Sequence, residues 1–439
     1  MFTRIVGNKL LSGTIHVSGS KNACLPILAA ALLVDRPCIV HNVPRVSDIL
    51  VMLKIIEQLG AEVSWIGSNS VKICAYNIIS KVPDGLASKI RGSICLMGAI
   101  IARNGYVSMP HPGGCNIGER PIDLHIKGLR ALGCNIEIAH NGNVNANGEN
   151  LHGATVNLCG KFGSTVTGTM NVILAALSAN GATSIEHAAI EPEVIDFCKC
   201  LTSMGADIEG IGTSHVLIHG KNKLHEFEHT VIGDRIEAGT FVCAGIISGK
   251  NVAITGLEYG TLDTFLEAIS IAGANVSQSN DGKITVKQSE MRGTNITTGQ
   301  YPALSTDLQP QLCTVLTQAY GDSAIVEKIY PDRFLYVREL KKMGADIRSM
   351  NGYVKIHGRT KLHGANLRST DLRASAALYL AGLYADGVTT IQNIHHLDRG
   401  YENFEYKLHE LGATVYRIND EGGTINSENI FALPVAVAV

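Results

Sequence analysis

The chain has almost no net charge and no long apolar run. Its 37 lysines and arginines against 39 acidic residues give a formal charge of −2 at pH 7, so no overall basic field points to nucleic acid. No apolar stretch approaches the roughly 20 residues that cross a bilayer. The opening MFTRIVGNKL lacks the long apolar segment of a signal peptide. We therefore expect neither a nucleic-acid nor a membrane partner.

Metal-binding cysteine motifs are also missing. The eleven cysteines include no C-x-x-C pair, and Cys198 and Cys200 fall in an apolar helical pattern that favours packing over metal binding. No other metal-ligand spacing stands out, so we predict neither a metal nor a cofactor. Free thiols in this number are typical of a reducing compartment, and we expect the protein to be cytoplasmic.

What is present is a globular composition, with 45% apolar and 17% charged residues. At 439 residues the chain is too long for one ordinary core, so two or more domains are expected. A phrase of the type LGAEV or MGADI recurs six times at intervals of about 70 residues, which indicates an internal repeat. Its glycines are Gly60, Gly133, Gly205, Gly273, Gly344 and Gly412.

Each copy of the phrase ends an amphipathic helix. Leu262, Phe265 and Ile269, for example, fall on one helical face before Gly273, and the glycine suits the left-handed cap that stops a helix. Each repeat also has an earlier segment that is rich in Ala and Gly and almost continuously apolar, which predicts a fully buried helix. These segments are 20–33, 91–103, 168–179, 237–248, 306–319 and 370–385.

Buried helices need strands around them, so three repeats would make one domain and six would make two. The predicted fold class is therefore α/β, with helices inside and strands outside each domain. We expect residues 21–230 to form the first three-repeat domain, and residues 1–20 with 231–439 to form the second. The chain would then start in the second domain, complete the first and return near residue 230.

Charged residues collect at the starts of the buried helices and in the loops before the amphipathic ones. Equivalent loops of a repeat lie at equivalent ends of a domain, and helix starts favour anions, so the pattern predicts a phosphate or carboxylate site. The alternative is that the acids only cap helices and the arginines are solvated. The residues concerned are Lys21, Asn22, Arg91, Asp307, Asp371 and Arg373 at helix starts, and Cys115, Arg120, Asp123, Arg333 and Arg399 in loops.

Cys115 follows two glycines in the stretch HPGGCNIGERPIDLH. Gly113 and Gly114 allow a tight turn and the close approach of a ligand, and Arg120 could lower the pKa of a nearby thiol. We expect a helix to begin here with Pro121 in its first turn. A lone cysteine is more often buried and inert, so the residues alone leave open both a reactive thiol in an anion site and a packing role.

These residues lie in stretches that resemble the UDP-N-acetylglucosamine 1-carboxyvinyltransferase family, the enolpyruvyl transferases of peptidoglycan synthesis. The resembling stretches include GSKNACLPILAAALL, PGGCNIGERPIDLHI, DRIEAGTF, STDLQPQ and TDLRASAALYLAGLYADG, in the family's order over about residues 1–418. The resemblance implies an inside-out α/β barrel made of two three-repeat domains. It implies an enzyme whose partners are two small-molecule substrates.

The implied reaction transfers the enolpyruvyl group of phosphoenolpyruvate to the 3-hydroxyl of UDP-N-acetylglucosamine and releases phosphate, by addition and elimination. This is the first committed step of peptidoglycan synthesis. Asp307 matches the family's base, Cys115 matches its proton donor, which can also form a covalent adduct, and Lys21 matches a catalytic cation. The matches to substrate-binding residues are Asn22, Arg91, Arg120, Pro121, Ile122, Asp123, Leu124, Lys161, Ile329, Arg333, Asp371, Arg373 and Arg399.

The sequence also departs from the family's pattern. The stretch KFGSTVTG at 161–168 is the weakest match, which leaves open a different nucleotide sugar as acceptor, and the tail FALPVAVAV has no counterpart. A shikimate-pathway enolpyruvyl transferase is the nearest rival, but that relative lacks a cysteine that matches Cys115. A non-catalytic repeat scaffold would have no reason to keep Asp307 and Cys115 together. The resemblance further implies that fosfomycin, a phosphonate epoxide, blocks the protein at Cys115.

Overall fold

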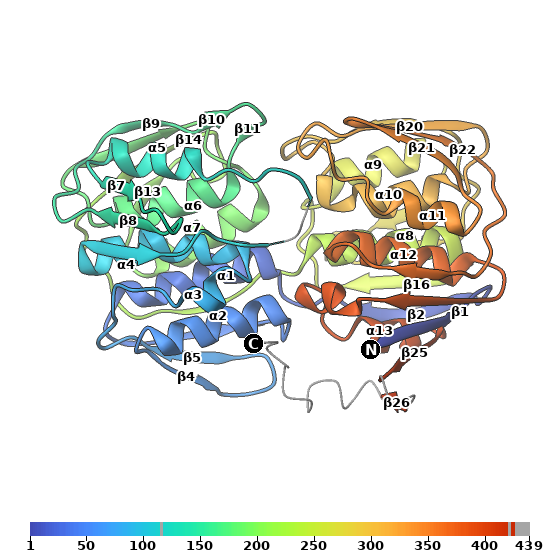
Figure 1. Ribbon diagram of the computed structural model, residues 1–439, viewed down its shortest axis with the longest axis horizontal. Helices are drawn as coiled ribbons and strands as arrows, with labels where there is room; N and C mark the ends of the chain where they lie inside the picture. Colours follow the sequence, from blue (N-terminus) through green and yellow to red (C-terminus); the bar gives the residue numbers. More distant parts are fainter. Residues whose placement is uncertain (115–116, 420–422, 426–439) are drawn as a thin grey trace. The chain divides into compact units, whose positions relative to one another are not determined.

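The chain folds into two compact units that both mix helices with small sheets (Figure 1). A computed structural model describes residues 1–114, 117–419 and 423–425. The unit that we call the central unit comprises residues 19–114 and 120–232, and the terminal unit comprises residues 1–18, 117–119 and the described residues from 233 onward. The α/β fold class is confirmed. No helix in the described ranges is long and apolar enough to cross a membrane.

The six almost continuously apolar segments form buried helices, as predicted. In α8 every residue is buried, so no face of this helix meets water and protein must surround it. The buried helices are α1 (Lys21–Ala30), α4 (Cys95–Asn104) and α6 (Val166–Ala176) in the central unit, and α8 (Arg235–Ser248), α10 (Gln309–Leu316) and α12 (Leu372–Tyr384) in the terminal unit. Short 3₁₀ helices are η1 (Ala31–Leu33), η2 (Arg91–Ile94), η3 (Thr306–Leu308) and η4 (Ile394–Arg399).

The amphipathic helices end on the repeated glycines. All six glycines have φ between 92° and 107°, a left-handed conformation that side chains with a Cβ rarely adopt. After each glycine the next residue donates its backbone N–H to the carbonyl five residues earlier, for example Ala61 to Ile56 at 3.2 Å, which is the Schellman motif. The predicted caps are therefore confirmed. These helices are α2 (Ser47–Gln58), α5 (Asp123–Ala131), α7 (Pro192–Ser203), α9 (Asp263–Ile271), α11 (Val337–Lys342) and α13 (Phe404–Glu410).

The strands of the central unit form three sheets in the described residues, besides a short hairpin of β10 (Cys159–Gly160) and β11 (Gly163–Ser164). The first sheet has the order β15 (Glu228–Thr230), β3 (Pro37–His41), β5 (Val71–Cys74), β4 (Glu62–Trp65). The second is β6 (Tyr106–Met109), β8 (Val144–Asn147), β7 (Asn135–Ile138), and the third is β13 (Asp207–Glu209), β14 (His215–His219), β12 (Ala182–Glu186), β9 (Thr155–Asn157). A short helix, α3 (Asp84–Ala87), precedes η2.

The described residues of the terminal unit also form three sheets. Their orders are β17 (Asn275–Gln278), β18 (Ile284–Lys287), β16 (Gly249–Thr255), β2 (Leu11–His16); then β19 (Asn295–Thr297), β20 (Asp322–Val326), β22 (Tyr353–His357), β21 (Asp346–Met350); and β23 (Asn366–Arg368), β24 (Val388–Gln392), β1 (Phe2–Val6), β25 (Thr414–Ile418), β26 (Thr424–Ile425). Strand β1 is antiparallel to both β24 and β25, and β2 is parallel to β16. The first sixteen residues thus complete sheets whose other strands come from after residue 248.

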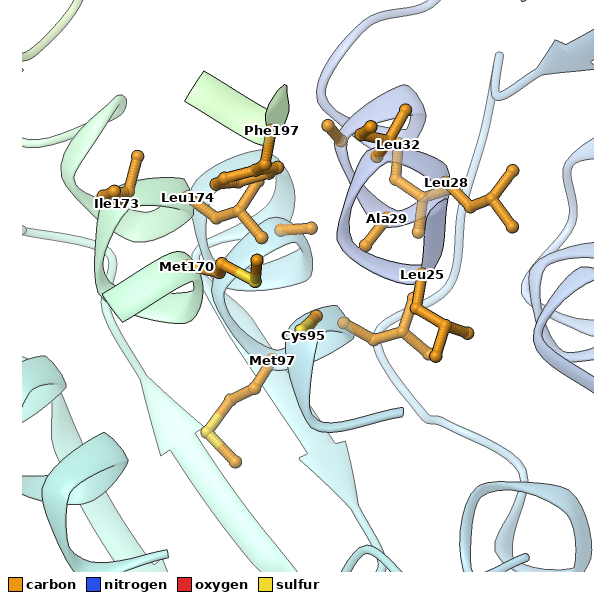
Figure 2. Packing of buried hydrophobic residues seen from close by; sticks show 14 of the residues in the cluster. Leu25, Leu28, Ala29, Leu32, Cys95, Met97, Met170, Ile173, Leu174 and Phe197 are labelled. Carbon is orange, nitrogen blue, oxygen red and sulfur yellow. The ribbon is translucent and has the colours of Figure 1, made fainter. Parts of the chain in front are cut away.

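The buried helices of the central unit pack through a hydrophobic cluster and, between α4 and α6, through a glycine. Leu28 of α1, Met170 and Leu174 of α6 and Phe197 of α7 pack into one cluster (Figure 2). Gly98 of α4 faces α6, and its backbone N–H donates to Asn171 Oδ1 at 2.7 Å. This contact fixes the register between two helices that have few polar groups to do so.

Gly98→Ala should therefore lower the free energy of unfolding, by about 1–3 kcal/mol or more. A Cβ at this position would lie 2.7 Å from Asn171 Oδ1 and closer still to the Asn171 carbonyl oxygen, so the helices would have to move apart. Chemical denaturation measures the effect. Gly85→Ala is the matched control, because a Cβ there meets nothing within 4 Å. Equal stability of the two variants would contradict the close helix contact.

Candidate active site

Asp307 lies at the start of a buried helix of the terminal unit and is bound by two arginines. Ser305 caps this helix start by accepting from the Asp307 N–H at 3.2 Å. Arg333 Nη1 donates to Asp307 Oδ1 at 2.7 Å, and Arg373 donates to Oδ2 through Nη2 at 3.0 Å and Nε at 3.1 Å. The arginine side chains are only 4% and 2% exposed, whereas Asp307 is 26% exposed. The carboxylate can therefore be reached from solvent while its partners are held rigidly.

The two guanidiniums set the charge of Asp307. Burial alone would raise the pKa of the Asp307 carboxyl, but the positive charges of Arg373 and Arg333 outweigh it and hold the pKa well below its usual range. The group is thus ionised at neutral pH. It is a weak proton acceptor as long as both arginines bind it, because their charge stabilises the carboxylate more than the acid.

Part of each guanidinium is left for another acceptor. Arg333 Nε and Arg373 Nη1 are buried, and neither has a hydrogen-bond partner in the described part of the chain. An unpaired donor on a buried charged group costs free energy, so these atoms favour binding of an anion such as a phosphate or a carboxylate. The Tyr401 ring lies 5.2 Å from the Arg373 guanidinium carbon and holds it from one side.

Asp371 has a structural role that the sequence left open. Its Oδ1 accepts from the backbone N–H groups of Arg373 at 3.0 Å and Ala374 at 3.1 Å, so it caps α12. The cap places Arg373 at the first turn of the helix, which points its side chain at Asp307. Asp371 therefore caps α12, and its assignment to the substrate site stays a prediction.

Ile329 lies in a loop that is tied to the Asp307 segment. Glu327 Oε1 accepts from the backbone N–H groups of Ile329 at 2.8 Å and Tyr330 at 3.0 Å. The other oxygen of Glu327 accepts from the Thr306 hydroxyl at 2.9 Å. One buried acid thus joins the loop that leads to Arg333 with the helix start that carries Asp307. Sequence reasoning missed Glu327, which no motif marks.

In the central unit, Lys21 is the first residue of α1. Its Nζ donates to Asp48 Oδ2 of α2 at 3.0 Å, and the side chain is 11% exposed. Asn22, the next residue, is exposed. Ser20 caps the helix by accepting from the Ala23 N–H at 3.4 Å. The lysine is therefore a fixed charge, paired with an acid, at a helix start.

Arg91 and Arg120 flank the glycines that precede Cys115, which itself lies outside the described residues. Arg91 Nη2 donates to the Pro121 carbonyl at 2.9 Å. Gly114 has a φ of 129°, and a Cβ there would lie 3.0 Å from Arg120 Nη1 and 3.1 Å from Arg91 Cβ. Gly113 packs directly on the Ser88 carbonyl, where a Cβ would clash. A side chain at either position would crowd these groups, so the glycines let the backbone approach them closely. Close approach of a ligand at this loop stays a prediction.

The segment after Arg120 differs from the prediction in one respect. Helix α5 begins at Asp123, so Pro121 precedes the helix instead of lying in its first turn. Leu124 contacts the β10–β11 hairpin, since a Cβ at Gly160 would be 2.9 Å from its side chain. Lys161 is exposed at the tip of this hairpin, with its Nζ 5.1 Å from the Phe162 ring centre. The structure therefore brings the expected nucleotide-sugar segment and Lys161 into one region.

His125 anchors this region and was missed from the sequence. Its Nε2 is 3.2 Å from the Thr167 hydroxyl and its Nδ1 is 3.1 Å from Asn171 Nδ2. Burial, with a smaller effect of Arg91, lowers the pKa of His125 to about 3. The ring is neutral and ties the start of α5 to α6. Its place directly after PIDL, inside a helical pattern, was the available signal.

Comparison with known proteins identifies the family of the chain. The model of the family described as EPSP synthase (3-phosphoshikimate 1-carboxyvinyltransferase) matches residues 5–408. The chain belongs to the EPSP synthase family. Within this family it is 45% identical over 414 residues to a UDP-N-acetylglucosamine 1-carboxyvinyltransferase of Methylacidiphilum infernorum, which covers 94% of this chain and 98% of that protein. Proteins of the same name from Akkermansia muciniphila and Dichelobacter nodosus are 43% and 40% identical over 417 and 418 residues, covering 94% and 95% of this chain and 98% and 99% of those proteins.

Two solved structures of related enzymes share the fold of this chain. The enolpyruvyl transferase NikO from Streptomyces tendae is 26% identical with a TM-score of 0.86, covering 94% of this chain and 98% of that chain. An EPSP synthase from Acinetobacter baumannii is 19% identical with a TM-score of 0.74, covering 95% and 100%, and supports the fold alone. The resemblance drawn from the sequence is confirmed, and the enolpyruvyl transferase fold with it.

Proposed function

We propose that the protein transfers the enolpyruvyl group of phosphoenolpyruvate to the 3-hydroxyl of UDP-N-acetylglucosamine and releases phosphate. The observation that carries this proposal is the 40–45% identity to UDP-N-acetylglucosamine 1-carboxyvinyltransferases over nearly the whole chain. The protein is accordingly a transferase of peptidoglycan synthesis. We place it in the cytoplasm, where both substrates would be its partners, with no role for nucleic acid or a membrane.

The chemistry is an addition followed by an elimination. Asp307 takes the proton of the acceptor hydroxyl, and the oxygen bonds to C2 of phosphoenolpyruvate while Cys115 gives a proton to the C3 methylene. The resulting ketal carries both the sugar oxygen and the phosphate oxygen on C2. Loss of a proton from C3 and cleavage of the bond between C2 and the phosphate oxygen then release phosphate and leave the enolpyruvyl ether.

The arginines around Asp307 suit the anionic substrate. The unpaired donors of Arg333 and Arg373 would bind a phosphate or carboxylate oxygen. An anion in that place would draw part of their charge away from Asp307 and so raise its basicity. Base strength would then depend on substrate binding, which is consistent with a carboxylate whose pKa is low in the unliganded protein.

The other predicted site residues are assigned to the two substrates. Lys21, Arg120 and Arg399 would hold the phosphate and carboxylate of phosphoenolpyruvate as charge shifts during the reaction. Arg91 and Asp371 are proposed to lie near these cations, as Arg333 and Arg373 are. The groups proposed to contact the nucleotide sugar are Asn22, Pro121, Ile122, Asp123, Leu124, Lys161 and Ile329. Lys161 at its exposed hairpin tip is suited to a diphosphate.

Phosphate release from phosphoenolpyruvate tests the proposal. We expect release with UDP-N-acetylglucosamine and none with shikimate 3-phosphate, because the relatives at 40% identity or more are named for the nucleotide sugar. UDP-N-acetylglucosamine without its 3-hydroxyl is the matched control and should give none. Release with shikimate 3-phosphate alone would assign the protein to the rival function. Release with neither acceptor would refute enolpyruvyl transfer to both.

A further inference from the structure

Arg417 is a buried guanidinium shared by two acids of the terminal unit. It lies on β25 and is 4% exposed. Nη1 donates to Asp398 Oδ2 at 3.0 Å and Nη2 to Asp398 Oδ1 at 2.7 Å, a bidentate pair. On its other side, Nη2 and Nε donate to Glu405 Oε1 at 2.7 and 3.2 Å.

Stability alone is a poor reason to keep this arrangement. Taking charges out of water costs free energy, and well-packed apolar residues in the same place often give a protein that is equally stable or more stable. What a buried bidentate pair supplies is a fixed geometry, because both side chains must hold one position to remain paired. The relevant question is therefore which segment Arg417 fixes.

The segment that Arg417 holds through Asp398 leads to the Asp307 cluster. Asp398 is in η4, and the chain from it packs on the start of α12, where a Cβ at Gly400 would lie 2.7 Å from Leu372. Tyr401 then contacts the Arg373 guanidinium through its ring, and its hydroxyl oxygen is 2.8 Å from Thr240 Oγ1 and accepts from Gln311 Nε2 at 3.1 Å. Residues 398–401 thus connect Asp398, which pairs with Arg417, to Tyr401, which contacts the Arg373 that binds Asp307.

We propose that Arg417 is a positioning residue for the phosphoenolpyruvate site. By holding Asp398, it fixes η4, the segment that carries Arg399 and leads to Tyr401, whose ring lies against Arg373. This inference rests on the proposed function, since Arg399 is assigned to the substrate there. The partners of Arg417 are Asp398 and Glu405, and in this proposal it acts through the segment that it orients.

The test is steady-state phosphate release by Arg417→Met, Arg417→Lys and Asp398→Asn. We expect Arg417→Met to raise KM for phosphoenolpyruvate at least tenfold, with kcat and KM for UDP-N-acetylglucosamine changed less than threefold. Arg417→Lys should recover part of the loss, because an ammonium can still pair with Asp398 but not in two places at once. Asp398→Asn should match Arg417→Met, and the double variant should be no worse than either, since both remove one interaction.

Tyr379→Phe is the matched control. The Tyr379 hydroxyl is buried in the same network and lies 2.7 Å from Glu405 Oε1 and 2.7 Å from Thr3 Oγ1, so it pairs with the other acid that Arg417 binds. This variant should lower the melting temperature and leave KM for phosphoenolpyruvate unchanged. An equal rise in KM for Tyr379→Phe, or no rise for Asp398→Asn, would overturn the positioning role.

Two further outcomes are separable. If Arg417→Met does not fold, Asp398→Asn carries the test, because Glu405 still neutralises Arg417 in that variant. Wild-type protein that releases no phosphate with either acceptor would refute the proposed function instead. The inference about Arg417 would then fall with it, whereas an active wild type with unaltered variants refutes the inference alone.

Discussion

Asp307→Asn is expected to lower kcat by about 10²–10⁴-fold, the usual loss when a general base is removed. An amide has nearly the shape of the carboxylate but cannot take the proton of the acceptor hydroxyl. The same change also removes the carboxylate that Arg333 and Arg373 share, and taking away one partner of a buried ion pair costs about 3–5 kcal/mol of stability. Phosphate-release kinetics and thermal unfolding measured on one preparation separate the two effects.

Two control measurements test this expectation. Asp322→Asn removes an acid that pairs with Lys355 and His357 at the surface of the same unit, and it should leave kcat unchanged. Inorganic phosphate should raise the melting temperature of Asp307→Asn more than that of the wild type, because the anion replaces the missing counter-charge. A folded Asp307→Asn protein with wild-type kcat would exclude Asp307 as the base.

Cys115→Ser is expected to abolish turnover, whereas Cys115→Asp should remain active and become resistant to thiol alkylation and to fosfomycin. A serine hydroxyl is too weak an acid to protonate carbon, but a carboxyl can still donate. The measurement is residual phosphate release after incubation with an alkylating agent. Inhibition of Cys115→Asp equal to that of the wild type would place the target elsewhere.

The structure identifies the control for this experiment. Among the described cysteines, Cys159 alone is exposed and the others are buried. Burial raises the pKa of Cys38 to about 11 and of Cys95 and Cys198 to about 12, so these thiols are protonated and unreactive at neutral pH. Cys159→Ser should therefore lose one alkylation site, detectable by mass, and remain fully inhibited.

The repeat glycines and the buried helices could be predicted because each depends on a local pattern. A glycine after an amphipathic run, or an unbroken apolar run with Ala and Gly, is recognisable within one turn or one helix. The charged groups at the helix starts were also recognisable, since they recur at the same place in each repeat. Their assignment to a substrate came from the family resemblance and not from spacing.

The partners of those groups could not be predicted. Arg333 and Arg373 meet Asp307 from 26 and 66 residues away, and their meeting depends on how closely the buried helices pack. Asp371 caps a helix, but in the sequence an acid at a helix start looks the same whether it caps the helix or binds a substrate. Arg417 lies on a strand that carries no motif. Its proposed role can be inferred only from the two acids that the fold places on either side of it.

The place of β1 has a consequence for synthesis of the protein. This strand, residues 2–6, pairs with β24 on one side and β25 on the other, and these strands end at residues 392 and 418. At the roughly 5–20 residues per second of translation, it waits about 20 to 80 s on the ribosome for its first partner. The central unit, whose last strand ends at residue 230, can fold during that interval. The nascent chain therefore carries an unpaired N-terminal β-segment for most of its elongation, the kind of segment that chaperones shield.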